Sequence, residues 1–234
     1  MCQSPEPEVI GNPPSPGFNL SDSDEKAMLI ADEVMVAQGG RQNWDDARYF
    51  TWVFFGSRKH FWDKKTGNIR IESLKDSSIY LLNLNSMEGK AKIRDTVYVN
   101  EEAAEFLQNA KKYWINDMYW LFMPFKLKDS GVTLKYNGEA TTKRGAQADV
   151  LQLTFNEVGV TPENKYLVYV DKNTRLVSQW DFYRDAAQDT ARFQLPWEGY
   201  RSYGNIKLAS SRDPYKLEDI DVPKTMDEVI FTEF

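Results

Sequence analysis

The chain has 234 residues, of which 41% are hydrophobic and 27% charged, with a formal net charge of −6 at pH 7 and a pI near 5.0. Such an acidic chain lacks the global positive field that a phosphate backbone requires, so nucleic acid is not an expected partner. One histidine, His60, and one cysteine, Cys2, exclude a zinc site of Cys/His type, a haem held by two such side chains and a disulfide within the chain.

Proline is concentrated at the N-terminus, where five of the ten prolines lie between residues 5 and 16 among serines and glycines. This composition buries too little apolar surface to fold, so residues 1–21 are predicted to form a disordered Pro/Ser-rich tether. The tether begins at Cys2, and a cysteine followed by a polar stalk is typical of a bacterial lipoprotein whose signal peptide has been removed. Acylation of Cys2 would attach the protein to a membrane, whereas the alternative is an ordinary start with an incidental cysteine. Residues 22–234 are predicted to form a single domain.

The first half of this domain is predicted to contain one helix followed by a series of strands. Cap oxygens and carboxylates at residues 21–25, an apolar periodicity and the pair Gly39–Gly40 predict an amphipathic helix over about residues 24–38. The segment Arg48–Gly56 is rich in β-branched and aromatic residues, which indicates a buried strand. A hairpin and further strands follow, and the expected ranges are Arg58–Asp63, Asn68–Ser73, Ile79–Leu84 and Lys90–Ile93.

The second half begins with a longer helix. Asn100 is predicted to cap it, glutamates lie at the positive end of its dipole, and Pro124 stops it. Its apolar positions recur at three and four residues and form a wide aromatic face. The strands expected after it are Val132–Tyr136, Ala148–Phe155, Tyr166–Val170, Leu176–Arg184, Ala191–Leu195, Ile206–Ala209 and Val229–Phe234. The acidic, proline-containing stretch from Asp213 is interpreted as an edge segment that discourages strand pairing.

A long succession of strands with two substantial helices predicts an antiparallel meander of the α+β class. Two amphipathic helices are buried most readily in the concavity of a strongly curved sheet. Strand periodicity by itself predicts no more than this class and this placement of the helices.

The order of the elements and several aromatic segments carry a family resemblance. These segments are Gly39–Gly40, Asn43–Trp44, Tyr49–Phe55, His60–Asp63 with the turn Thr66–Gly67, Tyr119–Leu127, the hairpin Tyr166–Asp171 and Arg175–Trp180, and Gly204–Ala209. In this pattern, over about residues 22–232, the chain resembles a bacterial family of uncharacterised LolA-like proteins, which are similar to outer-membrane lipoprotein carriers.

The resemblance implies a half-open barrel of about 11 antiparallel strands wrapped around two or three helices. It further implies that the apolar concave face receives the acyl chains of a lipid or lipoprotein, in the bacterial cell envelope. A location facing the periplasm or anchored to the outer membrane agrees with the lipoprotein interpretation of Cys2. Because the best-known carriers are soluble shuttles, a tether at Cys2 would instead make this chain an anchored receiver or a lipid-binding sensor. The resemblance brings no catalytic residues.

Aromatic residues make up 14% of the chain and are its main functional signal. Alternate residues of one strand and one face of the second helix supply candidates for the lining of a hydrophobic cavity: Phe50, Trp52, Phe54, Trp114, Met118 and Phe122. Each acyl methylene buried there contributes about 0.8 kcal/mol. The alternative is that these side chains pack against each other as core.

His60 is a candidate pH switch or general base, because the ordinary pKa of histidine lies near neutrality. The alternative is a strand residue that makes a structural hydrogen bond at the base of a hairpin.

The sequence therefore predicts a non-enzymatic, monomeric protein that binds a lipid or an acylated protein and uses no cofactor or metal. Two other classes stay open. One is an envelope scaffold that recruits a partner through a strand edge. The other is a carbohydrate-binding surface lipoprotein, whose sugar-stacking residues would be Trp62, Trp180, Trp197 and Tyr200.

Overall fold

The computed structural model describes residues 11–156 and 163–234, in which 14 strands form two antiparallel sheets. Contacts divide these residues into two compact units. The large unit comprises residues 43–123 and 195–234, and the small unit comprises residues 11–42, 124–156 and 163–194. The predicted class, α+β with an antiparallel sheet that does not close into a barrel, is confirmed. The strands nevertheless form two sheets instead of one, so the span 22–234 contains two compact units.

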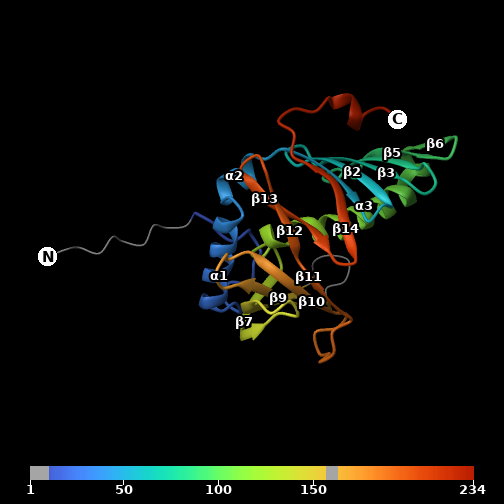
Figure 1. Cartoon of the computed structure of the whole chain (residues 1–234). Helices are drawn as coiled ribbons and strands as arrows, with labels where there is room; N and C mark the ends of the chain where they lie inside the picture. The colour runs from blue at the N-terminus through green and yellow to red at the C-terminus, as the bar shows by residue number, and fades with distance from the viewer. Residues whose placement is uncertain (1–10, 157–162) are drawn as a thin grey trace. The chain divides into compact units, whose positions relative to one another are not determined.

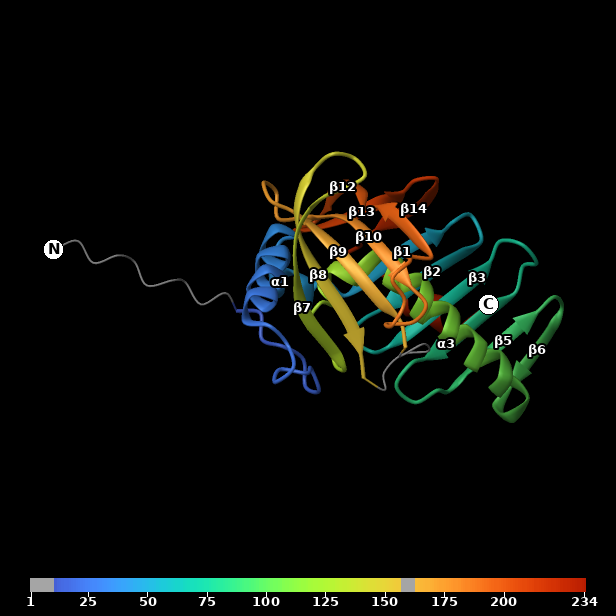
Figure 2. The same ribbon diagram turned by 90° about the horizontal axis from the view of Figure 1, so that it is seen from below.

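The large unit is built on a nine-stranded sheet in the order β12-β13-β14-β1-β2-β3-β4-β5-β6. Its strands are β1 (Tyr49–Phe54), β2 (Arg58–Asp63), β3 (Asn68–Ser73), β4 (Ile79–Asn83), β5 (Gly89–Ile93), β6 (Thr96–Val99), β12 (Glu198–Tyr203), β13 (Ile206–Arg212) and β14 (Tyr215–Asp221). The long helix α3 (Asn100–Phe122) packs against β4, β5 and β6, and Figure 2 shows it in green running along β5 and β6. One amphipathic helix thus covers one face of this sheet.

The small unit is built on a five-stranded sheet in the order β11-β10-β9-β8-β7. Its strands are β7 (Val132–Thr141), β8 (Gln147–Phe155), β9 (Lys165–Asp171), β10 (Val177–Tyr183) and β11 (Phe193–Pro196). Helix α1 (Glu25–Ala37) packs on β7 and buries Ala27, Ile30, Ala31, Val34 and Met35. Asp24 does not cap α1 with its side chain, because its carboxylate accepts from the backbone N–H of Tyr136 on β7 at 2.8 Å instead.

Two glycines make the hairpins of the large unit possible. Gly67 adopts φ +81° in the turn between β2 and β3, a conformation that L side chains rarely adopt. Gly89 begins β5 so close to β4 that a Cβ atom would lie 2.0 Å from the carbonyl oxygen of Leu81. The β2–β3 hairpin has the bounds that the sequence predicted.

Residues 11–21 lie against the small unit, although the sequence analysis assigned them to a disordered tether. The backbone N–H of Ser15 donates to the carbonyl of Lys128 at 2.9 Å, and Phe18 is only 9% exposed. Prolines lack an N–H and cannot donate backbone hydrogen bonds. The residues between them donate instead, and these bonds hold the stretch in place. Cys2 and the rest of the predicted tether lie outside the described residues, so the tether there and the acylation stay predictions.

The acidic stretch after Asp213 is a central strand, and its interpretation as an edge segment was wrong. β14 lies between β13 and β1, where Leu217 pairs with Phe54 and is 2% exposed. The acidic side chains of Glu218 and Asp221 are exposed beside it. Charged residues on the solvent-facing side of a strand therefore do not indicate whether the strand is central or at the edge of its sheet.

The predicted strand Val229–Phe234 was also wrong. This segment contains a short 3-10 helix, η2 (Glu228–Phe231). Asp227 is its N-cap, and the Asp227 side chain accepts a hydrogen bond from the N–H of Val229 at 3.0 Å. Arg70 of β3 donates to the carbonyl of Ile230 at 3.1 Å and so holds the C-terminal segment over the sheet, where Figure 1 shows it in red.

The sequence analysis missed β6, β12 and the short helix α2 (Arg41–Asp46). It also misassigned the start of α3. The N-cap residue is Val99, and Asn100 is the first helical residue, with φ +52° and no side-chain cap. No helix within the described ranges 11–156 and 163–234 is long and apolar enough to cross a membrane.

A buried arginine ties β13 to α3. Arg212 is 0% exposed, and it donates to the carbonyls of Ser211 and Trp120, both at 2.7 Å. The Trp120 carbonyl has no intrahelical donor because the residue four positions on is Pro124, which lacks an N–H. The guanidinium also lies 3.3 Å from the ring centroid of Trp197. Burial lowers the pKa of Arg212 to about 9, which leaves it charged at neutral pH.

We expect Arg212→Ala to lower the free energy of unfolding by about 3 kcal/mol, because it opens a cavity and removes the side-chain donor of the Trp120 carbonyl. Arg201→Ala, at an exposed position on β12, should change it by less than about 0.5 kcal/mol. Urea denaturation followed by tryptophan fluorescence measures both. Equal effects of the two substitutions would contradict a structural role for Arg212.

Candidate functional site

The large unit carries a cluster of aromatic rings between β1, β2 and α3. Strand alternation puts Phe50 and Trp52 on one face of β1, and their cross-strand partners Trp62 and His60 extend that face onto β2. From α3, the ring of Phe122 lies 4.9 Å from that of Phe50 and 5.5 Å from that of Trp52. We define the aromatic cluster by its six members: Trp44, Phe50, Trp52, Trp62, Trp114 and Phe122.

Four of the six predicted ligand-binding residues belong to this cluster: Phe50, Trp52, Trp114 and Phe122. The other two lie in the same unit, with Phe54 7% exposed on the same face of β1 and Met118 5% exposed on α3. The sequence thus identified side chains that the fold brings together. The cavity itself stays a prediction, because these rings contact one another in this structure.

Three polar atoms in and beside the cluster are buried without a hydrogen-bond partner among the described residues. They are Nε1 of Trp52, Nε1 of Trp114 and Nδ1 of His60. Leaving a buried donor or acceptor unsatisfied costs about 1–3 kcal/mol, and native interiors contain few such groups. These three atoms lie on side chains of β1, β2 and α3 that face the same region of the large unit.

A buried carboxylate joins α3 to the same sheet face. Asp117 is 0% exposed, and its Oδ2 accepts from Arg58 Nε at 2.6 Å and from His60 Nε2 at 2.7 Å. Its Oδ1 accepts from Arg58 Nη2 at 2.8 Å and from the side chain of Asn116 at 2.9 Å. The His60 ring stacks on Trp52, with 4.5 Å between centroids. We call Arg58, His60 and Asp117 the Asp117 centre.

The Asp117 centre is an ion pair with a neutral imidazole. Burial lowers the pKa of His60 below its ordinary 6.5, although the hydrogen bond to Asp117 acts in the opposite direction. Burial alone would raise the pKa of Asp117, but hydrogen bonds from His60 and Arg58 outweigh it and lower that pKa. The hydrogen bond to Asp117 raises the pKa of Arg58. Neutral His60 must donate through Nε2 to the carboxylate, so Nδ1 is left as an acceptor.

His60 makes the structural hydrogen bond that the sequence analysis gave as the alternative to a switch or a base. Asp117 and Arg58 were missed. The signal that could have revealed Asp117 is its position seven residues after Ala110 and four before Leu121, both buried residues of the same helix face. An acidic side chain at a core position of an amphipathic helix requires a partner.

The tryptophans considered for sugar stacking are not open platforms in this structure. Trp62 is 8% exposed, and Trp180 and Trp197 are each 1% exposed. A sugar face needs an accessible ring, so this arrangement does not favour the carbohydrate-binding alternative.

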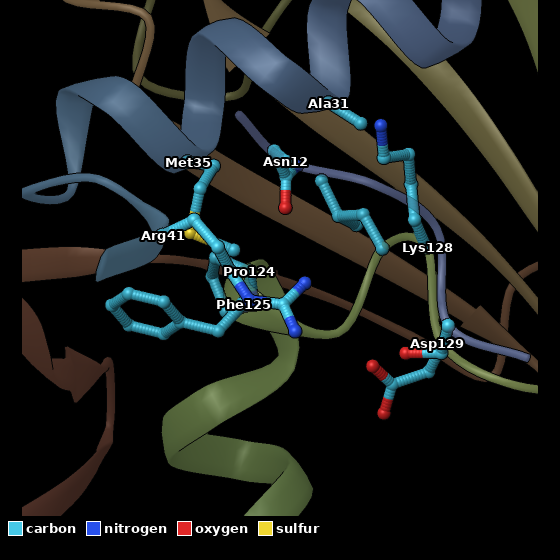
Figure 3. A pocket seen from close by; sticks show the side chains of 10 residues that line it. Asn12, Ala31, Met35, Arg41, Pro124, Phe125, Lys128 and Asp129 are labelled. Carbon is cyan, nitrogen blue, oxygen red and sulfur yellow. The ribbon is translucent and has the colours of Figure 1, made fainter. Parts of the chain in front are cut away.

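A pocket in the small unit lies between α1, the N-terminal segment and the chain after α3 (Figure 3). Its volume of about 10 Å³ has room for roughly one water molecule. The amide of Asn12 and the ammonium of Lys128 at its wall both donate to Asp32, at 2.7 and 2.5 Å. This pocket is too small for an acyl chain. Within the described part of the chain, no three His, Cys, Asp or Glu side chains are grouped so as to hold a metal ion.

We expect the free energy of unfolding to fall as the pH is lowered from about 7 to about 5. The folded-state pKa of His60 is lower than its unfolded value, so the unfolded chain binds more protons below about pH 6.5. One such group contributes a slope of at most about 1.4 kcal/mol per pH unit.

His60→Gln isolates this effect, because His60 is the chain's one histidine and glutamine keeps a donor for Asp117 without titrating. Urea denaturation at three pH values in this range should give a flatter slope for the variant than for the natural chain. Identical slopes would show that His60 is not held neutral by burial.

No protein-family model matches this chain, and no curated protein matches it. Among solved structures, the chain is similar to a DUF1329 family protein from Desulfovibrio piger, with 11% identity, a TM-score of 0.49 and coverage of 89% of this chain and 98% of that chain. It is also similar to MucB in complex with MucA(peri), with 13% identity, a TM-score of 0.27 and coverage of 87% and 58%. For the MucA/MucB complex of Pseudomonas aeruginosa the identity is 17%, the TM-score 0.28 and the coverage 70% and 53%. The chain thus spans little more than half the length of these last two, and likenesses at this level assign it neither a family nor a function.

Proposed function

We propose that the protein is a non-enzymatic binding protein of the bacterial cell envelope, and that it binds a lipid or an acyl chain between α3 and the face of β1 and β2. The observation that carries this proposal is the aromatic cluster. Its rings line facing surfaces of one helix and one sheet, and the indole N–H groups of Trp52 and Trp114 have no partner among the described residues. A cluster that served only as core would be expected to satisfy these groups.

Ligand entry requires α3 to move away from β1 and β2. The contact between Phe50 and Phe122 is apolar, so an acyl chain can replace it with contacts of the same kind. Ten methylenes leaving water would contribute about 8 kcal/mol toward displacement of the helix. Met118 on the buried face of α3 is flexible and adapts to changing contents.

The Asp117 centre supports a binding role over a catalytic one. Its carboxylate accepts four hydrogen bonds, so it has little capacity left to take a proton from a substrate. His60 is 0% exposed, and its Nδ1 is buried, so neither ring nitrogen is accessible to a substrate in solution.

The envelope location is supported by the sequence alone. A cysteine followed by a polar stretch rich in proline and serine, as at Cys2, is typical of the stalk of a bacterial lipoprotein. Acylation there would place the aromatic cluster near a membrane that supplies lipids and acylated proteins, the partners that we propose.

A second candidate function is recruitment of a protein partner through β6. This strand ends the sheet order, and Val97 and Val99 on it are 48% and 43% exposed. Because β6 pairs with β5 on one side, its other side can accept an added strand.

We expect native mass spectrometry of the protein purified from a bacterial host to show an added lipid mass that solvent extraction removes. Extraction separates a bound ligand from an acyl group that is covalently attached to Cys2. A protein of unmodified mass that takes up no added fatty acid would rule out the lipid-binding proposal and favour the β6 candidate.

The variant Phe50→Leu should weaken binding of an apolar fluorescent probe about fivefold, which corresponds to a loss of about 1 kcal/mol of ring contact. Phe61→Leu is the matched control, because Phe61 is the same residue type on β2 but alternates with His60 and Trp62 and so points to the opposite face. Probe titrations of both variants test whether binding occurs on the clustered face. Equal weakening would place the probe elsewhere.

A further inference from the structure

The strand β2 presents three donors that converge on one carboxylate. Arg58 contributes two N–H groups, one to each oxygen of Asp117, at 2.6 and 2.8 Å, and His60 contributes a third at 2.7 Å. Bidentate arginine with an added imidazole donor is a strong geometry for a carboxylate. Arg58 and His60 are two residues apart on the same face of one strand, so all three donors come from β2. The carboxylate that occupies them, in contrast, comes from α3.

The donors of β2 lie between the aromatic cluster and the solvent-exposed surface. On the inner side, the His60 ring is stacked 4.5 Å from Trp52, which contacts Phe122. On the outer side, the Arg58 side chain is 23% exposed and its guanidinium lies 4.7 Å from the ring centroid of Tyr113, a residue 38% exposed. A partly exposed cation beside an apolar face suits a ligand with an anionic head and an apolar tail.

We propose that Arg58 and His60 form the head-group site for a carboxylate ligand of the fatty-acid type, and that Asp117 occupies this site in its absence. This inference rests on the proposed function and names the chemical class of its ligand. The ligand carboxylate takes the three donors of β2, its alkyl chain enters the aromatic cluster, and α3 is released because Asp117 has lost its partners.

The exchange conserves charge. One carboxylate leaves the site for water while another enters it, so Arg58 is never left buried without a counter-charge. A neutral alcohol of the same length cannot make this exchange, because it has no charge to pair with Arg58. A phosphate brings up to two negative charges and additional oxygens, for which the single cation and three donors of the site are too few.

The test compares dodecanoate with dodecanol, whose alkyl chains are equal in length and whose heads differ in charge. Calorimetric or tryptophan-fluorescence titration of the full chain should give a dissociation constant about tenfold lower for the acid, or about 1.4 kcal/mol. Arg58→Gln should abolish this preference, because it removes the charge that distinguishes the two heads. Lys59→Gln removes the same charge from the next residue, on the opposite face of β2, and should retain the preference.

Asp117→Asn removes the internal competitor. It should strengthen dodecanoate binding about tenfold and dodecanol binding by less, because the alcohol gains only the easier movement of α3 and not the vacated donors. Glu105→Gln, at an exposed position of the same helix, is the matched control and should change neither.

Nuclear magnetic resonance of the unmodified chain gives a test that does not depend on the folding of any variant. His60 is the one histidine, so its ring nitrogens give an unambiguous signal, which should shift on addition of dodecanoate but not of dodecanol. Equal binding of acid and alcohol, with no shift at His60, would overturn the head-group site and leave the proposed function intact. Binding of neither compound would overturn both.

Discussion

The buried carboxylate of Asp117 is the interaction on which the arrangement of the large unit depends. A charge placed at a core position of α3 must meet compensating donors, and β2 supplies them from Arg58 and His60. This requirement fixes the rotation of α3 about its axis. With Asp117 turned toward β2, the same helix brings Phe122 against Phe50 and Trp114 against Trp62 in the aromatic cluster. Buried ion pairs add little net stability, and orientation is the role that this geometry favours.

A second buried charge acts at the end of the same helix. Pro124 deprives the Trp120 carbonyl of its usual donor, and Arg212 of β13 replaces it. The C-terminal half of α3 is therefore held by two specific polar contacts. Its N-terminal half is held by apolar contacts, with Ala103, Leu107 and Ala110 buried and the ring of Phe106 4.7 Å from that of Tyr98. The specificity of the helix position thus resides in its second half, beside the aromatic cluster.

Local patterns in the sequence were sufficient for the elements that local interactions decide. Turn residues around Gly67 and alternation on both sides of it gave the β2–β3 hairpin, and apolar spacing gave α1 and α3, although neither helix has the expected side-chain cap. Such local patterns could not predict the order of the strands in the sheet. β14 pairs with β1 through residues far apart in the chain, such as Phe54 and Leu217. Asp117 was missed because a polar residue in a helix is ordinarily assigned to the solvent face.

The position of β1 has a consequence for the order in which the protein forms. β1 is made early, yet one of its two neighbours, β14, lies in a part of the chain that is synthesised only after α3 and strands β7 to β13. Until that part emerges, β1 has a free edge composed largely of aromatic and β-branched residues, which is the kind of edge that associates with other chains. Folding of the large unit is therefore dominated by long loop closure, and its nascent form is the state in which a chaperone would be most useful.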